Sequence, residues 1–194
     1  MFFLELGSVY LGLDMGQEAI GAFDQGLRLD PRDEYLRDLR AVADGIVAGG
    51  VPEEVFTPFR QGLDALTVDP ETALTLFDEV LDVAPDFHLA HLNRGIGLAA
   101  VARNAEAEDA VRRAIDLDPR YPESHAALAV VLLSQERNDE AEAALQQALA
   151  LDPAHVEALR GLGMVYLLTE RAELAASYFL RASRLSPLDL GLKV

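Results

Sequence analysis

The sequence contains no cysteine. This absence excludes a disulfide framework, a thiolate metal site and a cysteine nucleophile, and it leaves the redox compartment undefined. No stretch approaches the roughly 20 consecutive apolar residues that a membrane-spanning helix needs. The start of the chain, MFFLELGSVYLGLDMG, has neither the basic segment nor the small-residue cleavage site of a signal peptide. We therefore expect a soluble cytoplasmic protein, with the periplasm left open.

Basic residues are scarce, since 16 Lys and Arg stand against 33 Asp and Glu, and the net charge is -17. Phosphate binding needs clustered Lys and Arg on one face, so nucleic acid is not expected as a partner. The only lysine is Lys193. The preference for arginine over lysine is typical of GC-rich genomes, and an acidic chain with almost no lysine also occurs in halophiles. The negative charge therefore either attracts basic partners or keeps the protein solvated.

Strand-favouring residues are also comparatively sparse, whereas Ala and Leu dominate, which favours helices. Prolines divide the chain into periods: Pro85, Pro119, Pro153 and Pro187 follow one another at intervals of 34 residues. Proline lacks an amide hydrogen and clashes with the preceding helical turn, so each one ends a helix. Two apolar-periodic runs with a polar turn between them precede each proline, which predicts a helix-turn-helix unit.

Large, small and aromatic residues recur in phase within these periods. The first period supplies Phe3, Leu6, Gly7, Tyr10, Ala19, Phe23 and Pro31, and the last supplies Leu159, Leu162, Gly163, Tyr166, Ala175, Phe179, Ala182 and Pro187. In these positions the chain resembles the tetratricopeptide repeat (TPR) family. The resemblance implies an all-α, right-handed superhelical solenoid of about five helix-turn-helix repeats, in which the first helix of each repeat lines a concave face.

One period is longer than the others. Pro31 and Pro85 are 54 residues apart, which is one period plus 20, so the sequence predicts an inserted helix, ended by Gly49 and Gly50. The repeat that follows it is degenerate in its first helix, and its turn is one residue short. The predicted single solenoid consists of repeat 1 (1–33), the inserted helix (34–50), degenerate repeat 2 (51–86), repeats 3 (87–120), 4 (121–154) and 5 (155–188), and a tail (189–194).

The resemblance also places a binding groove on the concave face. Family positions 2, 5, 6, 9, 12 and 13 point away from the core, and in repeats 3 to 5 most of them are apolar. We expect this groove to take an apolar helix or extended segment of another protein, with acidic flanks that attract a basic partner. The predicted groove residues are Leu89, Leu92, Asn93, Ile96, Glu123, Val130, Leu133, Glu157, Arg160, Met164, Leu167 and Leu168.

Three alternatives to an open groove stay possible at this point. The inserted helix covers the apolar strip, a second copy of the chain covers it, or the assigned phase is off by one residue. The chaperone-type carboxylate clamp of the family uses Lys, Asn and Arg at groove positions, and only Asn93 matches it here. Capture of an acidic C-terminal tail is therefore not expected.

The sequence shows no group of residues that would form a catalytic site. His88 and His91 lie one helical turn apart, as a pair of metal ligands would. However, His91 and His125 occupy the same position in successive repeats, so packing explains these histidines. Acidic pairs such as Asp139 and Glu140 fall at helix starts, where carboxylates suit the free amides. We expect no catalytic site, no cofactor and no metal. The predicted function is a non-catalytic protein-interaction scaffold or adaptor.

The two ends of the chain are compatible with other functions as well. Met1 begins inside the first helix without an N-cap, and only LDLGLKV follows Pro187, so neither end has a capping helix. Either a partner or a second copy seals the ends, or the chain is an excerpt of a longer one. The alternatives are thus the regulatory or substrate-docking part of a larger enzyme, or a self-assembling homo-oligomer.

Overall fold

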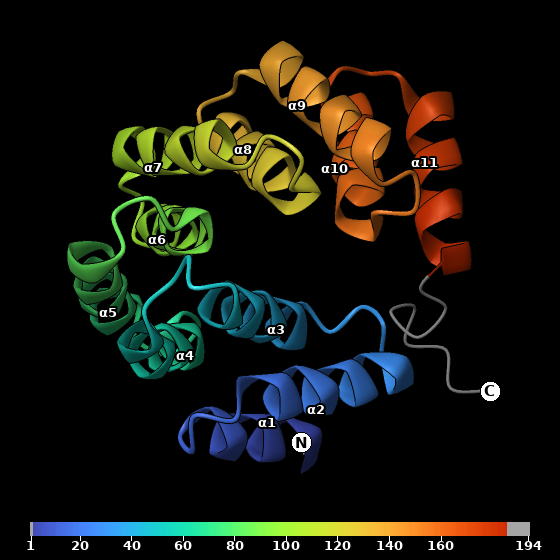
Figure 1. Cartoon of the computed structure of the whole chain (residues 1–194). Coiled ribbons are helices and arrows are strands. Elements are labelled where there is room, and N and C mark those ends of the chain that lie inside the picture. Colours follow the sequence, from blue (N-terminus) through green and yellow to red (C-terminus); the bar gives the residue numbers. More distant parts are fainter. Residues whose placement is uncertain (1, 186–194) are drawn as a thin grey trace. The chain divides into compact units, whose positions relative to one another are not determined.

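The computed structural model describes residues 2–185, and all regular structure in this range is helical. This confirms the expected all-α fold (Figure 1). Pro187, which closes the fifth predicted repeat, and the tail 189–194 lie outside the described residues. None of the helices in the described range is long and apolar enough to cross a membrane. In chain order the elements are α1 (Phe2–Leu11), α2 (Gly16–Leu29), α3 (Glu34–Val47), the 3-10 helix η1 (Glu53–Val55), α4 (Phe56–Ala65), α5 (Pro70–Val83), α6 (His88–Ala100), α7 (Asn104–Leu117), α8 (Pro122–Ser134), α9 (Asn138–Leu151), α10 (Val156–Leu168) and α11 (Ala172–Leu185).

The chain forms two compact units, unit 1 (1–93) and unit 2 (94–194), and the division falls inside α6. In unit 1, α1 pairs with α2 and α4 pairs with α5. In unit 2, α8 pairs with α9 and α10 pairs with α11, while α7 packs on α8 and α9 packs on α10. Both units are therefore built from helical hairpins.

A recurring turn joins the helices of the hairpins. Ala102, Glu136 and Glu170, spaced 34 residues apart, all adopt the left-handed conformation, with φ of 60°, 62° and 60°. In the first of these turns the N–H of Ala102 donates to the carbonyl of Ala99 at 3.0 Å, and the next N–H donates to the carbonyl of Leu98 at 2.9 Å. This is a Schellman motif, which satisfies the carbonyl groups left open at the end of a helix.

We expect Ala102→Gly to stabilise unit 2 by about 0.5–1 kcal/mol. The left-handed conformation costs a non-glycine residue about 1–2 kcal/mol, part of which the greater unfolded-state entropy of glycine offsets. Urea unfolding followed by far-UV circular dichroism would measure the change. The control is Ala143→Gly at an exposed site in the middle of α9, which should destabilise by about 1 kcal/mol. A loss of stability in both variants would contradict the prediction.

The prolines that close the repeats are tied to the helix that follows. The helices α5, α7 and α9 each end two residues before Pro85, Pro119 and Pro153, respectively. The Nε2 atom of His91 donates to the carbonyl of Pro85 at 2.8 Å, and that of His125 donates to the carbonyl of Pro119 at 3.0 Å. These two histidines, one repeat apart, therefore fix the same loop in successive repeats.

Glycines in the first helix of a hairpin make room for large residues in the second. A Cβ atom added to Gly163 would lie 2.7 Å from the ring of Phe179. The degenerate repeat keeps this contact, since a Cβ atom on Gly62 would also lie 2.7 Å from the ring of Phe77. Gly62 and Phe77 are 15 residues apart, against 16 for Gly163 and Phe179. Helix α4 ends three residues after its glycine whereas α10 ends five after its own, and the turn 66–69 is one residue longer than the turn 169–171. The first helix of the degenerate repeat is therefore shorter, and not its turn as predicted. The packing is thus preserved although the motif is altered.

Helix α3 lies in the segment where the inserted helix is predicted. Its N-cap is Asp33, whose Oδ1 accepts a hydrogen bond from the N–H of Leu36 at 2.9 Å. The helix is followed by Gly49, whose φ of 72° is a conformation that glycine adopts without strain. Helix α3 packs against α2 and buries Leu39 and Val42 completely.

Candidate functional site

An apolar surface is exposed on two neighbouring first helices of unit 2. Helices α8 and α10 contact each other and bury one side of each helix in the core, including Leu132 and Leu162. On other sides they leave Val130 63%, Met164 48% and Leu168 56% exposed. A helix that is apolar all round is normally buried, so an exposed apolar side marks a surface for a partner. We call this surface the α8–α10 strip and define it as Val130, Leu133, Met164, Leu167 and Leu168.

The remaining strip residues and their polar neighbours differ in accessibility. Leu167 is 52% exposed, whereas Leu133 is half-buried. Arg160 and Glu157 on α10 are exposed, and only 14% of the Glu123 side chain on α8 is accessible. The sequence assigned all of these residues to the groove. Ile96, on the part of α6 that belongs to unit 2, is 41% exposed.

Three predicted groove residues do not line an open surface. Leu89, Leu92 and Asn93, on the part of α6 that belongs to unit 1, are all buried. The Nδ2 atom of Asn93 donates to Oδ2 of Asp38 on α3 at 3.1 Å and to the carbonyl of Leu89 at 3.0 Å. The prediction for these three side chains was therefore wrong. Helix α3 supplies a partner to the asparagine, which a regular repeat array would not do.

His155 is a feature of this region that the sequence did not single out. It is the N-cap of α10, and its Nδ1 atom accepts a hydrogen bond from the N–H of Ala158 at 3.2 Å. The ring is only 4% exposed, and its nitrogens lie 4.0 Å from a carboxylate oxygen of Glu123 and 3.8 Å from one of Glu157. Histidine is not among the usual N-cap residues, and the residue three positions later is alanine and not Glu or Gln, so no sequence signal marks this cap.

We expect His155→Ala to lower the free energy of unfolding by about 2 kcal/mol. The substitution removes the cap, which is worth about 1 kcal/mol, and leaves a cavity in the interior. His155→Asn keeps an acceptor at the cap and should lose about half as much. Thermal unfolding gives the total, and hydrogen exchange in the first turn of α10 reports the cap. Equal losses in both variants would show that the cap contributes nothing.

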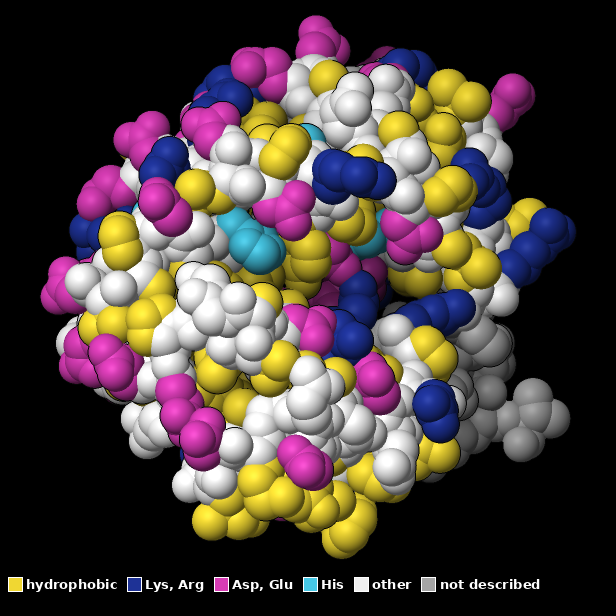
Figure 2. Space-filling view, viewed as in Figure 1, with side chains coloured by type: hydrophobic (Ala, Val, Ile, Leu, Met, Phe, Trp, Pro, Cys, Tyr) yellow, Lys and Arg dark blue, Asp and Glu magenta, His cyan; other side chains and the backbone are white. Residues whose placement is uncertain are grey.

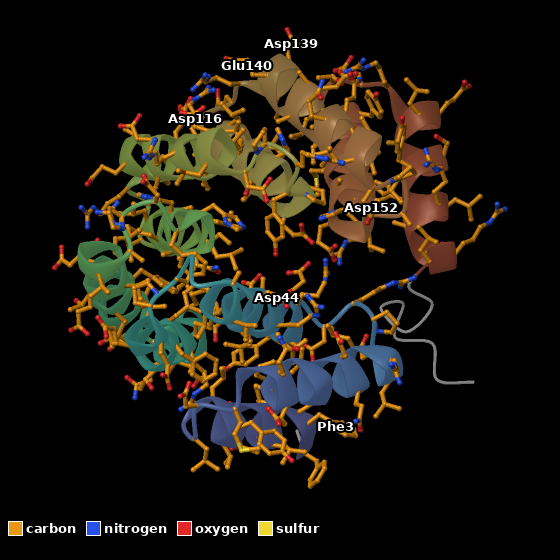
Figure 3. All side chains as sticks on the ribbon, viewed as in Figure 1. Phe3, Asp44, Asp116, Asp139, Glu140 and Asp152 are labelled. Atoms are coloured by element: carbon orange, nitrogen blue, oxygen red, sulfur yellow. The ribbon has the colours of Figure 1, made fainter. Side chains whose placement is uncertain are left out.

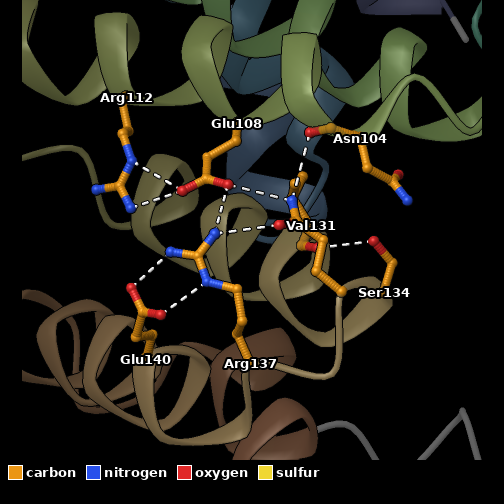
Figure 4. Close-up of polar contacts among 8 residues, drawn as sticks. Asn104, Glu108, Arg112, Val131, Ser134, Arg137 and Glu140 are labelled. Carbon is orange, nitrogen blue, oxygen red and sulfur yellow. Dashed lines mark hydrogen bonds and ion pairs between the residues drawn. The ribbon is translucent and has the colours of Figure 1, made fainter.

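A charged network connects successive hairpins of unit 2 (Figure 4). Glu108 on α7 binds Arg112 on the same helix at 2.7 Å and Arg137, in the turn before α9, at 2.6 Å. Although burial alone raises the pKa of Glu108, hydrogen bonds from Arg112, Arg137 and Gln135 lower it to about 2. One repeat further on, Arg171 binds Glu142 in the same relation. The network therefore joins hairpins.

The acidic residues at the start of α9 also have a structural role. Asp139 and Glu140 lie at the N-terminal end of this helix (Figure 3), and Glu140 forms an ion pair with Arg137 at 2.6 Å. This ion pair lowers the pKa of Glu140. Among the described residues there is no group of three or more histidine and carboxylate side chains that could hold a metal.

A second exposed apolar surface lies in unit 1. Phe2, Val9 and Leu13 on α1 and the turn after it are 70%, 56% and 62% exposed. In the space-filling view, hydrophobic side chains gather along the edge of the molecule where α1 lies (Figure 2). The opposite side of α1 packs against α2 through Gly7, where an added Cβ atom would clash with the ring of Phe23.

Repeated hairpins with Schellman turns, glycine–aromatic contacts and an exposed first-helix surface define a helical-repeat protein. The model of the family described as "Tetratricopeptide repeat" matches residues 68–122 and 126–189, which is more than half of the chain. The chain therefore belongs to the tetratricopeptide repeat family, which confirms the resemblance found in the sequence. No curated protein matches it.

Several solved structures are similar to this chain. TTC0263, a thermophilic TPR protein in Thermus thermophilus, has a TM-score of 0.66 and 22% identity over 97% of this chain and 92% of that chain. MamA 41-end from Desulfovibrio magneticus has a TM-score of 0.60 and 18% identity over 96% and 94%. The first TPR of Spaghetti (RPAP3), bound to the HSP90 peptide SRMEEVD, has a TM-score of 0.57 and 17% identity over 60% and 93%. At these identities the similarity shows the fold alone.

Proposed function

We propose that this protein is a non-catalytic interaction scaffold and that the α8–α10 strip binds an apolar helix or extended segment of another protein. The observation that carries the proposal is the exposure of Val130, Met164 and Leu168 on two packed first helices. Complete burial of a fully exposed side chain of this size is worth about 1.5–3 kcal/mol, so each of these half-exposed side chains contributes roughly half of that when a partner covers it. The similar TPR domain of RPAP3 binds a peptide, which supports segment binding as the general mode.

The polar residues next to the strip favour a partner with both apolar and charged groups. Arg160 and Glu157 flank the strip from α10 and would contact the backbone or charged side chains of a bound segment. A carboxylate clamp does not fit this chain, because Asn93, the one residue that matches such a clamp, is buried and bonded to Asp38. An apolar core contact with a polar rim is the arrangement that we propose.

A scaffold role fits the structural use of the residues that could otherwise do chemistry. His91 and His125 are bonded to proline carbonyls, and His155 caps a helix. Glu108 and Arg137 hold neighbouring hairpins together. Each of these groups has a role in the fold, so the apolar surface is the feature that calls for a function.

The test is capture of partners from the source cell by the intact chain and by the double variant Val130→Asp with Met164→Asp. We expect the variant to lose its partner, with affinity at least about tenfold lower, because two charges replace apolar contacts at the centre of the interface. The matched control is Leu174→Asp with Leu180→Asp, which places two charges on exposed apolar sites of α11, 45% and 52% accessible. Thermal unfolding must show that all variants fold.

Two results would contradict the proposal. In one, the strip variant captures the same proteins as the wild type with similar affinity. In the other, the α11 control loses the partner as fully as the strip variant does, which would mean that added negative charge, rather than the strip, abolishes binding.

A further inference from the structure

Unit 1 contains an open cavity of about 430 Å³ between the turn after α1, the C-terminal end of α3 and η1. Its apolar lining consists of Leu11, Met15, Ile46 and Val47. The walls approach closely because α2 begins with a glycine: a Cβ atom on Gly16 would lie 2.5 Å from Cγ2 of Val47. Met15 and Val47 are 36% and 41% exposed, so a ligand from solvent can reach the apolar part.

Three carboxylates complete the lining, and they come from three different segments. Asp14 lies in the turn after α1, Glu18 in the first turn of α2 and Glu53 in η1, whereas no Lys or Arg lines the cavity. Within residues 2–185 none of these three side chains has a hydrogen bond or an ion pair. Elsewhere in unit 1, Asp24 and Asp44 are both paired with Arg40. The charge at the cavity is thus uncompensated.

The surroundings strengthen the negative potential at this place. Helices α1 and α3 both end at the cavity, and their last carbonyl groups carry partial negative charge. Helix α2 presents its positive N-terminal end there, which offsets only part of this charge. Unit 1 as a whole holds 18 acidic and five basic residues, a net charge of -13, so the long-range field also attracts a cation.

We propose that this cavity binds the side chain of a lysine or arginine presented by a partner protein. The alkyl stem packs on Met15 and Val47, and the charged head lies among Asp14, Glu18 and Glu53. Lys and Arg combine an apolar stem with a charged head, which matches a cavity with an apolar wall and acidic groups. A bare divalent ion needs a cage of oxygen ligands, and no three carboxylates in the described range are close enough to hold one.

This site is separate from the α8–α10 strip, because it lies in unit 1 and the strip lies in unit 2. The two proposals can therefore fail independently.

The test is an NMR titration of the full isotope-labelled chain with two capped pentapeptides, Ala-Leu-Lys-Leu-Ala and the same peptide with norleucine in place of lysine. We expect the lysine peptide to shift the amide signals of Gly16 and Val47 saturably. The norleucine peptide, which has the stem without the charge, should bind at least about tenfold more weakly. Binding of the lysine peptide should also weaken as salt is raised.

The variant Asp14→Asn, Glu18→Gln and Glu53→Gln should bind the lysine peptide at least about tenfold more weakly. Asparagine tolerates the left-handed conformation of residue 14, whose φ is 57°, so the turn is kept. The matched control is Glu71→Gln, Glu79→Gln and Asp82→Asn, which removes three exposed charges from α5 in the same unit. The control should bind within about twofold of the wild type.

Three outcomes would overturn the proposal. Equal weakening in both triple variants would show that only the net charge matters. Equal binding of the two peptides would show that the cation is not recognised. The absence of saturable shifts at Gly16 and Val47 up to about 10 mM peptide, beyond the weakest affinity of a useful site, would show that the cavity takes no basic side chain.

Discussion

Replacing Phe77 by alanine is expected to lower the free energy of unfolding of unit 1 by about 3–5 kcal/mol. The side chain is completely buried, and its ring lies edge-on to Phe59 with centroids 5.8 Å apart. It also contacts Gly62 on α4, so its loss opens a cavity between two paired helices. Urea unfolding followed by far-UV circular dichroism measures the total, and hydrogen exchange in α4 and α5 localises it.

A double-mutant cycle tests whether Gly62 and Phe77 act as a pair. Gly62→Ala alone should cost about 1–3 kcal/mol, because its Cβ atom would overlap the ring. Combined with Phe77→Leu, it should cost less than the sum of the two single changes. The corresponding positions in unit 2 already hold such a combination, Ala129 and Leu145, which share one buried cluster. Strictly additive losses would contradict this account of the degenerate repeat.

The ion pairs of Glu108 are expected to make unit 2 less stable in acid. Its pKa is about 2 in the folded protein, against an ordinary value of 4.5 in the unfolded chain. A lowered pKa stabilises the fold above the unfolded value, and this contribution is lost as the pH falls from about 4.5 to about 2. Glu108→Gln should therefore reduce stability by about 2 kcal/mol at neutral pH, with a discount for screening by solvent. Near pH 2 most of the difference should be lost, and it should vanish below the folded pKa.

The measurement is a series of urea unfolding curves between neutral pH and about pH 2 for both proteins. Asp109→Asn is the control, because it removes a charge from the neighbouring residue of the same helix, exposed and outside the network. Its effect should be small and nearly constant. If the gap between the wild type and Glu108→Gln did not narrow in acid, the network would not be the source of the pH dependence.

The sequence predicted the hairpins because their boundaries depend on local chemistry. Pro119 and Pro153 end helices by removing an amide donor, wherever the rest of the chain lies. The inserted segment could be recognised by counting residues between prolines, and Asp33 and Gly49 bound the helix found there by a side-chain cap and a left-handed turn. The left-handed turns at Ala102, Glu136 and Glu170 were not predicted, because none of these residues is glycine.

Some of the predicted groove residues are exposed and others are buried, and the difference has a physical reason. The position of a residue in the repeat indicates whether it lies on the side of the helix that points away from its own hairpin, and Val130 and Met164 are exposed on that side. The position does not indicate whether another helix packs on the same side. Leu89 and Leu92 have groove positions in their repeat but are buried, and Asn93 bonds to Asp38 on the helix that interrupts the regular array. The sequence had left covering by the inserted helix as an alternative.

By itself, the sequence determined the class of this protein, its family and the lengths of its hairpins, because proline stops, helical periodicity and glycine–aromatic pairs are local properties of the chain. Tertiary structure decided which apolar side chains stay accessible and which charges find partners. The cavity of Asp14, Glu18 and Glu53 illustrates the difference: Glu53 is distant in sequence from the other two, and only the packing of α3 beside the start of α2 brings all three around one space. Whether a side chain stays accessible depends on all the neighbours that pack against it. The position of a residue in the repeat indicates only its packing within its own hairpin.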